Sequence, residues 1–344
     1  MTAHLNTLAD LRAGRLAGAT HLDLRHCELD EFPREIFALA DTLASLDLSL
    51  NRLRTLPDDL PRLRALRTLF CSANPFETLP PVLGRCEGLD IVGFKANAIA
   101  HVPPESIPAS LRWLILSDNR IEAMPETLGA CRNLMKLALA GNRLTRLPDG
   151  IARCESLELL RLSANRFATL EDALPDGLLA LPRLTWLAYA GNPFNAAREA
   201  RALAATPIAH IAWHELELGE LLGEGASGHI WSARWRPAGG GDRPVAVKLF
   251  KGAVTSDGLP GSEMATCIAA GVPAHLIAIE GRIDGHPQGA QGLMHGDFYA
   301  HNLLVDDAHA LLGDFGAASF LPEDDDVRAA ALKRIDGRAL DVLV

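Results

Sequence analysis

Residues 43–57 read LASLDLSLNRLRTLP, in which leucines alternate with other residues ahead of Asn51 and a Leu-Pro pair follows it. Alternating leucines place one face of a short strand in a core and leave the other face outside. One such unit cannot bury its own leucines, so repeated copies must stack. The pattern returns at intervals of 23, 23, 22, 23, 23 and 27 residues, around Asn74, Asn97, Asn119, Asn142, Asn165 and Asn192.

The unit L-x-x-L-x-L-x-x-N-x-L resembles the leucine-rich repeat. That resemblance implies an α/β solenoid, a horseshoe with parallel strands on its concave face. We expect each asparagine side chain to satisfy backbone groups where the chain leaves the strand. An earlier unit, LDLRHCEL, carries Cys27 at the asparagine position, and the residues before it are expected to form a helical cap.

The cysteines follow the repeat. Cys86, Cys131 and Cys154 each lie 20 residues after the first leucine of their unit, and Cys71 replaces a core leucine. Their spacing is not of a metal-binding type, so we interpret them as small core residues with reduced thiols.

The outward positions of the predicted strands carry large apolar side chains. A solenoid needs no aromatic residues there for its own stability, so an apolar stripe favours docking of a protein or peptide on the concave face. The alternatives are packing against the chain's own second domain, or no docking at all. The stripe consists of Phe70, Ile91, Trp113, Ile115, Leu159 and Trp186.

The repeat pattern ends after Pro193 in an alanine-rich stretch that is expected to form a capping helix. We therefore predict a leucine-rich-repeat domain with caps at 1–205, a linker at 206–213 and a second domain at 214–344. The net charge of −10 falls mostly on the second domain, so a nucleic-acid partner is not expected. The sequence has neither an export signal nor an apolar run long enough for a membrane, which predicts a cytoplasmic protein without a membrane partner.

A different pattern begins in the second domain, at residues 218–231. LGELLGEGASGHIW contains Gly223, Gly225 and Gly228 in G-x-G-x-x-G spacing, which nucleotide-binding loops share with ordinary hairpins. An apolar strand, VAVK, then ends at Lys248, and Glu263 follows on an expected helix.

The segment MHGDFYAHNLLVDDAHALLGDFGAAS adds the most specific signal. Asp297 and Asn302 are five residues apart, and Asp314-Phe315-Gly316 follows an expected two-stranded hairpin. In this order and spacing the motifs resemble the protein-kinase catalytic domain, which implies an incomplete α+β protein-kinase-like domain that uses ATP and Mg²⁺.

The resemblance also implies a role for each matching residue. Lys248, held by Glu263, would orient the ATP phosphates, and Asp297 would accept the proton of the substrate hydroxyl. Asp336 would be a buried helix carboxylate that supports the catalytic loop. The other implied contacts are the glycine loop over the phosphates (Gly223, Gly225, Gly228), the adenine pocket (Ile230, Ala246) and the two Mg²⁺ sites (Asn302, Asp314).

Several departures from the kinase pattern matter. Gly296 replaces the arginine before the catalytic aspartate, so phosphorylation of an activation loop is not expected to switch this domain. Only residues 284–294 separate an expected strand from His295, too few for an adenine-binding hinge and the lower-lobe helices. Either the natural protein has segments that this sequence lacks, or the domain is a reduced kinase with weak or absent catalysis.

The leading hypothesis is a protein kinase that phosphorylates Ser or Thr on a partner recruited by the repeats. The first alternative is a non-catalytic interaction scaffold in which the kinase-like part is a pseudokinase. The second is a small-molecule kinase, which is suggested by the His-Gly-Asp motif at 295–297 and by Tyr299.

Overall fold

The computed structural model describes residues 2–205, 209–224, 228–251, 254, 258–270, 279–286, 292–295, 303–305, 310–312, 320–322 and 325–343. The chain forms two compact units. The first comprises Met1–Arg161, Asn165–Leu187 and Pro322–Val344, and the second comprises Leu162–Ala164 and Ala188–Leu321. Among the described residues, no helix combines the length and the apolar character needed to cross a bilayer.

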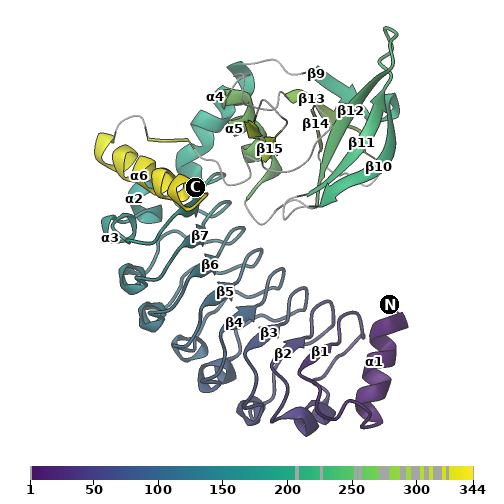
Figure 1. Cartoon of the computed structure of the whole chain (residues 1–344). Coiled ribbons are helices and arrows are strands. Elements are labelled where there is room, and N and C mark those ends of the chain that lie inside the picture. The colour runs from purple at the N-terminus through teal and green to yellow at the C-terminus, as the bar shows by residue number, and fades with distance from the viewer. Residues whose placement is uncertain are drawn as a thin grey trace. The chain divides into compact units, whose positions relative to one another are not determined.

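The first unit is built on a parallel sheet whose strands follow one another in chain order (Figure 1). Neighbouring strands keep one register throughout, so that Leu46 pairs with Leu69 and Leu114 with Leu137. The predicted solenoid of parallel strands is therefore confirmed. Its strands are β1 His21–Asp23, β2 Ser45–Asp47, β3 Thr68–Phe70, β4 Ile91–Gly93, β5 Trp113–Ile115, β6 Lys136–Ala138, β7 Leu159–Arg161 and β8 Trp186–Ala188.

Short helical turns return the chain from each strand to the next. They are η1 Arg34–Leu39, η2 Leu60–Arg62, η3 Pro81–Arg85, η4 Pro104–Ser106, η5 Glu126–Ala130, η6 Asp149–Arg153, α2 Leu170–Ala173 and α3 Asp176–Leu179. Helix α1 (Thr2–Arg12) precedes β1 and buries Leu8 and Leu11. It is the helix expected at the start of the repeats.

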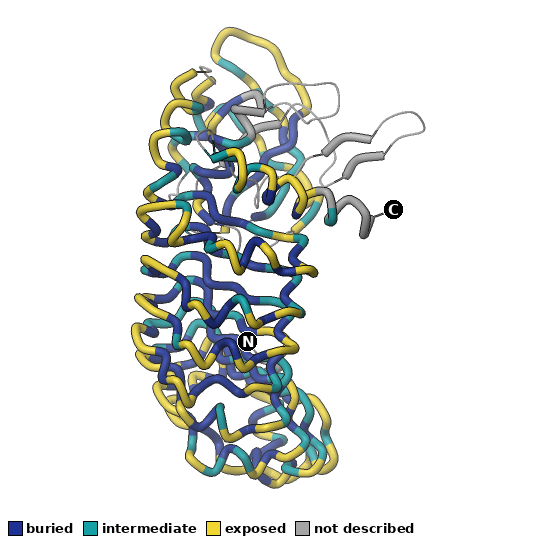
Figure 2. Tube along the Cα trace, turned by 90° about the vertical axis from the view of Figure 1, so that its left-hand side faces the viewer, coloured by how far each residue is buried: buried dark blue, intermediate teal, exposed yellow. Residues whose placement is uncertain are grey.

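The core of the first unit is a stack of leucines closed by an asparagine ladder. Figure 2 shows the buried stretches recurring from one repeat to the next. Within the ladder, Asn119 Oδ1 accepts a hydrogen bond from the Ile99 N–H at 3.0 Å, and its Nδ2 donates to the Phe94 carbonyl at 2.8 Å. Asn51 and Asn74 make equivalent bonds to the repeat before them. The expected role of the asparagines is thus confirmed.

The residue before each of these asparagines has a left-handed backbone. Only two of these positions are glycine, Gly141 and Gly191. Elsewhere a side chain adopts φ between 52° and 59°, at a cost of about 1 kcal/mol per residue. The regular turn into the asparagine therefore overrides local backbone preference. The non-glycine positions before asparagines are Leu50, Ala73, Ala96, Asp118 and Ala164, and His26 has the same backbone conformation before Cys27.

The cysteines of the repeats are buried, free thiols, as expected for core residues. Burial raises the pKa of Cys86 and of Cys154 to about 11 and that of Cys131 to about 12. At neutral pH these groups are thiols rather than reactive thiolates.

The C-terminal helix α6 (Asp326–Leu343) belongs to the first unit, although we predicted residues 214–344 to form one domain. It buries Ala331, Leu332 and Ile335, and it contacts α3. The Arg338 guanidinium donates to the carbonyls of Leu181 and Pro182, both at 2.7 Å. These contacts explain why the helix groups with the repeats.

The second unit contains a six-stranded sheet in the order β10-β11-β12-β14-β13-β9 (Figure 1). Strands β10, β11, β12, β14 and β13 pair antiparallel in that order, and β9 pairs parallel with β13. The strands are β9 Ala209–Ala212, β10 Leu216–Glu224, β11 Gly228–Trp235, β12 Arg243–Phe250, β13 Ile279–Asp284 and β14 Gly292–His295. The remaining elements are η7 Pro193–Asn195, α4 Ala196–Ala205, η8 Trp213–Glu215, α5 Pro260–Ala270, and the hairpin β15 Leu303–Val305 with β16 Ala310–Leu312.

The predicted linker at 206–213 differs from the structure over its described part. Residues 209–212 form β9, because Ile211 is fully buried in an apolar cluster with Val245, Val247 and Ile283. The alanine-rich stretch does form a helix, α4, and this helix packs against α5 within the second unit.

Candidate functional site

The alternation of β12 separates an apolar face of the sheet from a face that carries Lys248. Val245 and Val247 point into the buried apolar cluster. Ala246 and Lys248 therefore point to the other face. Directly opposite them on β11 lie Ser232 and Ile230. The residues that we assigned to the adenine pocket and to the phosphates thus share one face of the sheet.

Helix α5 supplies the partner of Lys248. Lys248 Nζ forms a hydrogen-bonded ion pair with Glu263 Oε1. Both residues are almost fully buried, with 7% and 5% of their surface exposed. Lys248 Nζ also lies 5.3 Å from the centre of the Phe250 ring. A charge in such a place is tolerated only when it is paired and hydrogen-bonded, so the two residues require each other.

The described glycines of the motif lie near the end of β10 and at the start of β11. Gly223 pairs with Ile230, and Gly228 pairs with Phe250. A Cβ atom at Gly228 would lie 2.6 Å from the Leu249 carbonyl oxygen, so the pairing of β11 with β12 itself requires a glycine there. Gly225 lies outside the described residues.

The catalytic-loop and metal residues that we predicted, Asp297, Asn302 and Asp314, lie outside the described residues. The strands that flank them are described. Strand β14 ends at His295, the first residue of the His-Gly-Asp motif, and β15 pairs antiparallel with β16, as expected for the hairpin.

Asp336 does not match the expected buried carboxylate. It lies on α6 and is exposed, because the helix turns Ala331, Leu332 and Ile335 inward instead.

The apolar stripe occupies the solvent-facing side of the parallel sheet in two rows. The first, the tryptophan row, pairs Ile91 with Trp113, then Lys136 and then Leu159. Trp186 continues it, because its N–H donates to the Glu158 carbonyl at 3.0 Å just as the Trp113 N–H donates to the carbonyl of Asp90. Trp113 and Trp186 remain exposed by 37% and 38%.

Phe70 and Ile115 belong to the second row, with Gly93 between them. A Cβ atom at Gly93 would lie 2.5 Å from the Phe70 ring, so the ring lies over this glycine. All six predicted stripe residues thus lie on the solvent-facing side of one sheet, as the register required.

Sequence analysis missed the lysine within the tryptophan row. Lys136 Nζ lies 5.0 Å from the centre of the Trp113 ring, a distance at which a cation is attracted to the ring face. The signal was available, because Lys136 is the third residue of its repeat, the same position as Trp113. The row is therefore aromatic and cationic rather than purely apolar.

The family comparison agrees with the repeat pattern of the first unit. A family model described as Leucine rich repeat matches residues 109–167. Residues 109–167 therefore carry the leucine-rich repeat. A solved leucine-rich-repeat protein from Leptospira interrogans is 26% identical, with a TM-score of 0.48, and the match covers 54% of this chain and 52% of that one. This chain therefore matches about half the length of that protein. None of the curated proteins matches it.

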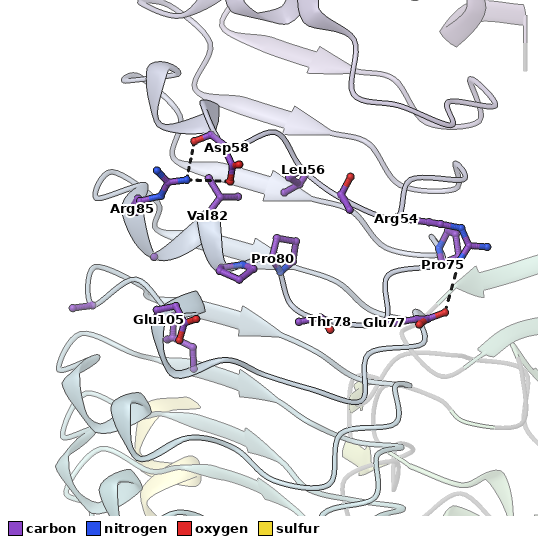
Figure 3. A pocket seen from close by; sticks show the side chains of 15 residues that line it. Arg54, Leu56, Asp58, Pro75, Glu77, Thr78, Pro80, Val82, Arg85 and Glu105 are labelled. Carbon is purple, nitrogen blue, oxygen red and sulfur yellow. Dashed lines mark hydrogen bonds and ion pairs between the residues drawn. The ribbon is translucent and has the colours of Figure 1, made fainter.

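The leucine-rich-repeat domain also has a groove of about 850 Å³ among its loops and short helices (Figure 3). Its rim is ionic: the Arg85 guanidinium donates to the Asp58 carboxylate at 3.3 Å, and Arg54 lies 3.7 Å from Glu77. Sequence analysis did not predict the groove, because its lining comes from several successive repeats and no chemical motif marks it.

Proposed function

We propose that the chain is an ATP- and Mg²⁺-dependent protein kinase, which phosphorylates Ser or Thr on a protein partner recruited by its leucine-rich repeats. The observation that carries the catalytic half of this proposal is the buried Lys248–Glu263 pair. A lysine on the third strand, paired with a glutamate on the next helix, is the arrangement that protein kinases use to orient ATP phosphates.

The surroundings of Lys248 fit a nucleotide. The lysine is a cation that shares its sheet face with the apolar Ile230 and Ala246, so one face offers contacts for phosphates and for a base. The kinase resemblance assigns Mg²⁺ to Asn302 and Asp314. When bound, Mg²⁺ would neutralise phosphate charge. Lys248 and Glu263 would hold the phosphate tail in place.

Isothermal titration calorimetry with ATP and Mg²⁺ tests nucleotide binding. We expect Lys248→Ala to weaken the affinity at least about tenfold, because a charge-assisted hydrogen bond to a phosphate contributes roughly 1.5–3 kcal/mol. Lys251→Ala is the matched control, since it removes a neighbouring lysine that pairs with Glu224. Absence of heat with the unaltered chain would contradict nucleotide binding, and an equal loss in both variants would contradict the role of Lys248.

Partner recruitment rests on the tryptophan row. Exposed aromatic residues in a row with a lysine offer the anchors that dominate protein interfaces. We expect Trp113→Ala with Trp186→Ala to abolish capture of the partner that the unaltered chain retains, while the chain stays folded because both side chains lie on the solvent-facing side of the sheet. Capture of the partner by the double variant at the level of the unaltered chain would contradict partner binding by the tryptophan row. Arg120→Ala, an exposed change in the repeat of Trp113, serves as the control.

A non-catalytic interaction scaffold is the alternative, and one observation favours it. Strand β14 runs to His295, so only Gly296 separates the sheet from Asp297, and no room remains for an adenine-binding hinge. A phosphotransfer assay with Asp297→Asn separates the two functions. Loss of phosphate transfer with partner binding intact favours the kinase, whereas a function that survives the change favours the scaffold.

A further inference from the structure

Helix α4 is linked to α5 by a carboxylate that accepts two hydrogen bonds. Glu199 Oε1 accepts from the Gly191 N–H at 2.7 Å, and Glu199 Oε2 accepts from Ser262 Oγ at 2.9 Å. Gly191, Glu199 and Ser262 all belong to the second unit. One side chain thus ties the end of the last repeat to the helix that carries Glu263.

The contact is made at the first turn of α5. Ser262 is only 3% exposed and directly precedes Glu263, and the N–H groups of both residues donate to the Leu259 carbonyl. Since Glu263 is the next residue after Ser262, the hydroxyl that Glu199 holds and the carboxylate that reaches Lys248 belong to the same turn.

Glycines bring this turn close to the last repeat. A Cβ atom at Gly191 would lie 3.0 Å from Ser262 Oγ, and one at Gly258 would lie 2.6 Å from Ser163 Cβ. The start of α5 is therefore fitted tightly against the backbone that leads into α4. A shift of α4 cannot occur without a change in these contacts.

The same end of the repeats also contacts the segment that follows the Asp-Phe-Gly motif. The Arg198 guanidinium donates to the Leu321 carbonyl at 2.8 Å, and the Tyr189 hydroxyl donates to the Phe320 carbonyl at 3.0 Å. Arg198 is the neighbour of Glu199 on α4. The first turn of α5 and the segment at Phe320 and Leu321 are thus held by adjacent residues of one helix, Glu199 and Arg198.

We infer that Glu199 is a positioning residue. It acts through Ser262 to fix the first turn of α5, and thereby keeps the Glu263 carboxylate paired with the Lys248 ammonium group. In a protein kinase, phosphate orientation requires the lysine–glutamate pair to be formed. The consequence for ATP rests on the proposed function, whereas the effect on the ion pair does not. Helix α4, which directly follows the repeats in sequence, would then regulate the nucleotide site.

Amine-reactive labelling of Lys248 in the full chain, followed by mass spectrometry, measures the ion pair directly. A buried, paired lysine reacts only when the site opens. Loss of the hydrogen bond between Ser262 and Glu199 should raise the open population, and with it the labelling rate, about fivefold in Ser262→Ala. Glu199→Ala, which also loses the bond from the Gly191 N–H, should raise the rate at least as much. Glu199→Gln should restore the slow rate, because its amide can still accept from Gly191 and donate to the Ser262 hydroxyl.

The controls separate this inference from the proposed function. Glu87→Ala removes an exposed carboxylate from the leucine-rich-repeat domain and should leave the labelling unchanged. A rate in both Glu199→Ala and Ser262→Ala equal to that of the unaltered chain would overturn the positioning role, even if ATP binds. Faster labelling without any ATP binding by the unaltered chain would support the positioning role and overturn the kinase instead.

Discussion

Glu263→Ala should lower the free energy of unfolding of the second unit by about 3–5 kcal/mol, the largest effect that we expect from a single change. Lys248 is 7% exposed, and in the variant its ammonium group would remain buried without the carboxylate that pairs with it. Removing one partner of a buried ion pair is strongly destabilising, because the other charge stays buried after its main counter-charge is gone. Urea unfolding, followed by the fluorescence of the tryptophans on β11 and in η8, reports the loss.

A double variant shows whether the loss comes from the buried charge that stays on Lys248. Lys248→Met together with Glu263→Leu replaces the ion pair by apolar side chains of similar size, which is often neutral for stability. We expect the double variant to unfold near the midpoint of the unaltered chain while ATP binding is lost. Equal destabilisation by the single and the double variant would contradict this explanation. It would mean that the packing of the two side chains, rather than the buried charge, determines the stability. Glu224→Ala, which breaks the exposed pair with Lys251, is the control and should cost less than about 1 kcal/mol.

The fold of the repeats could be predicted almost completely because the same sequence pattern recurs in every unit. The leucines that face the core, the asparagine ladder and the buried cysteines follow from one register. The register also placed Trp113 and Trp186 on the solvent-facing side of the sheet. Lys136 occupies the same repeat position as Trp113, but a charged residue does not belong to the apolar pattern that defined the stripe.

The structure of the rest of the chain could not be predicted in the same way, because its contacts join segments that are far apart in the sequence. Arg328 pairs with Asp176, 152 residues earlier in the sequence, and no local pattern marks either residue. Ile211 reads as part of a linker until β13 is present to pair with β9. The Lys248–Glu263 pair could be anticipated because a known motif fixes both positions, whereas the link from Glu199 to Ser262 belongs to no motif.

Asn119→Leu should lower the free energy of unfolding of the leucine-rich-repeat domain by about 3 kcal/mol, because a buried N–H group loses its acceptor. Leucine matches asparagine roughly in size but cannot accept the hydrogen bond from Ile99 N–H. The carbonyls of Phe94 and Leu116 are less affected, since each also accepts a bond from a neighbouring ladder asparagine. Most of the cost therefore falls on one donor.

Repeats contact mainly their neighbours, so this damage should stay local. Hydrogen exchange should speed up at Ile99 and in the adjoining repeats, while the exchange of β1 and β2 stays slow. Arg120→Ala, one residue further along, removes an exposed side chain and should change the unfolding midpoint little. A loss below about 1 kcal/mol in Asn119→Leu would mean that the Ile99 N–H finds another acceptor. The ladder would then specify the turn without contributing much to stability.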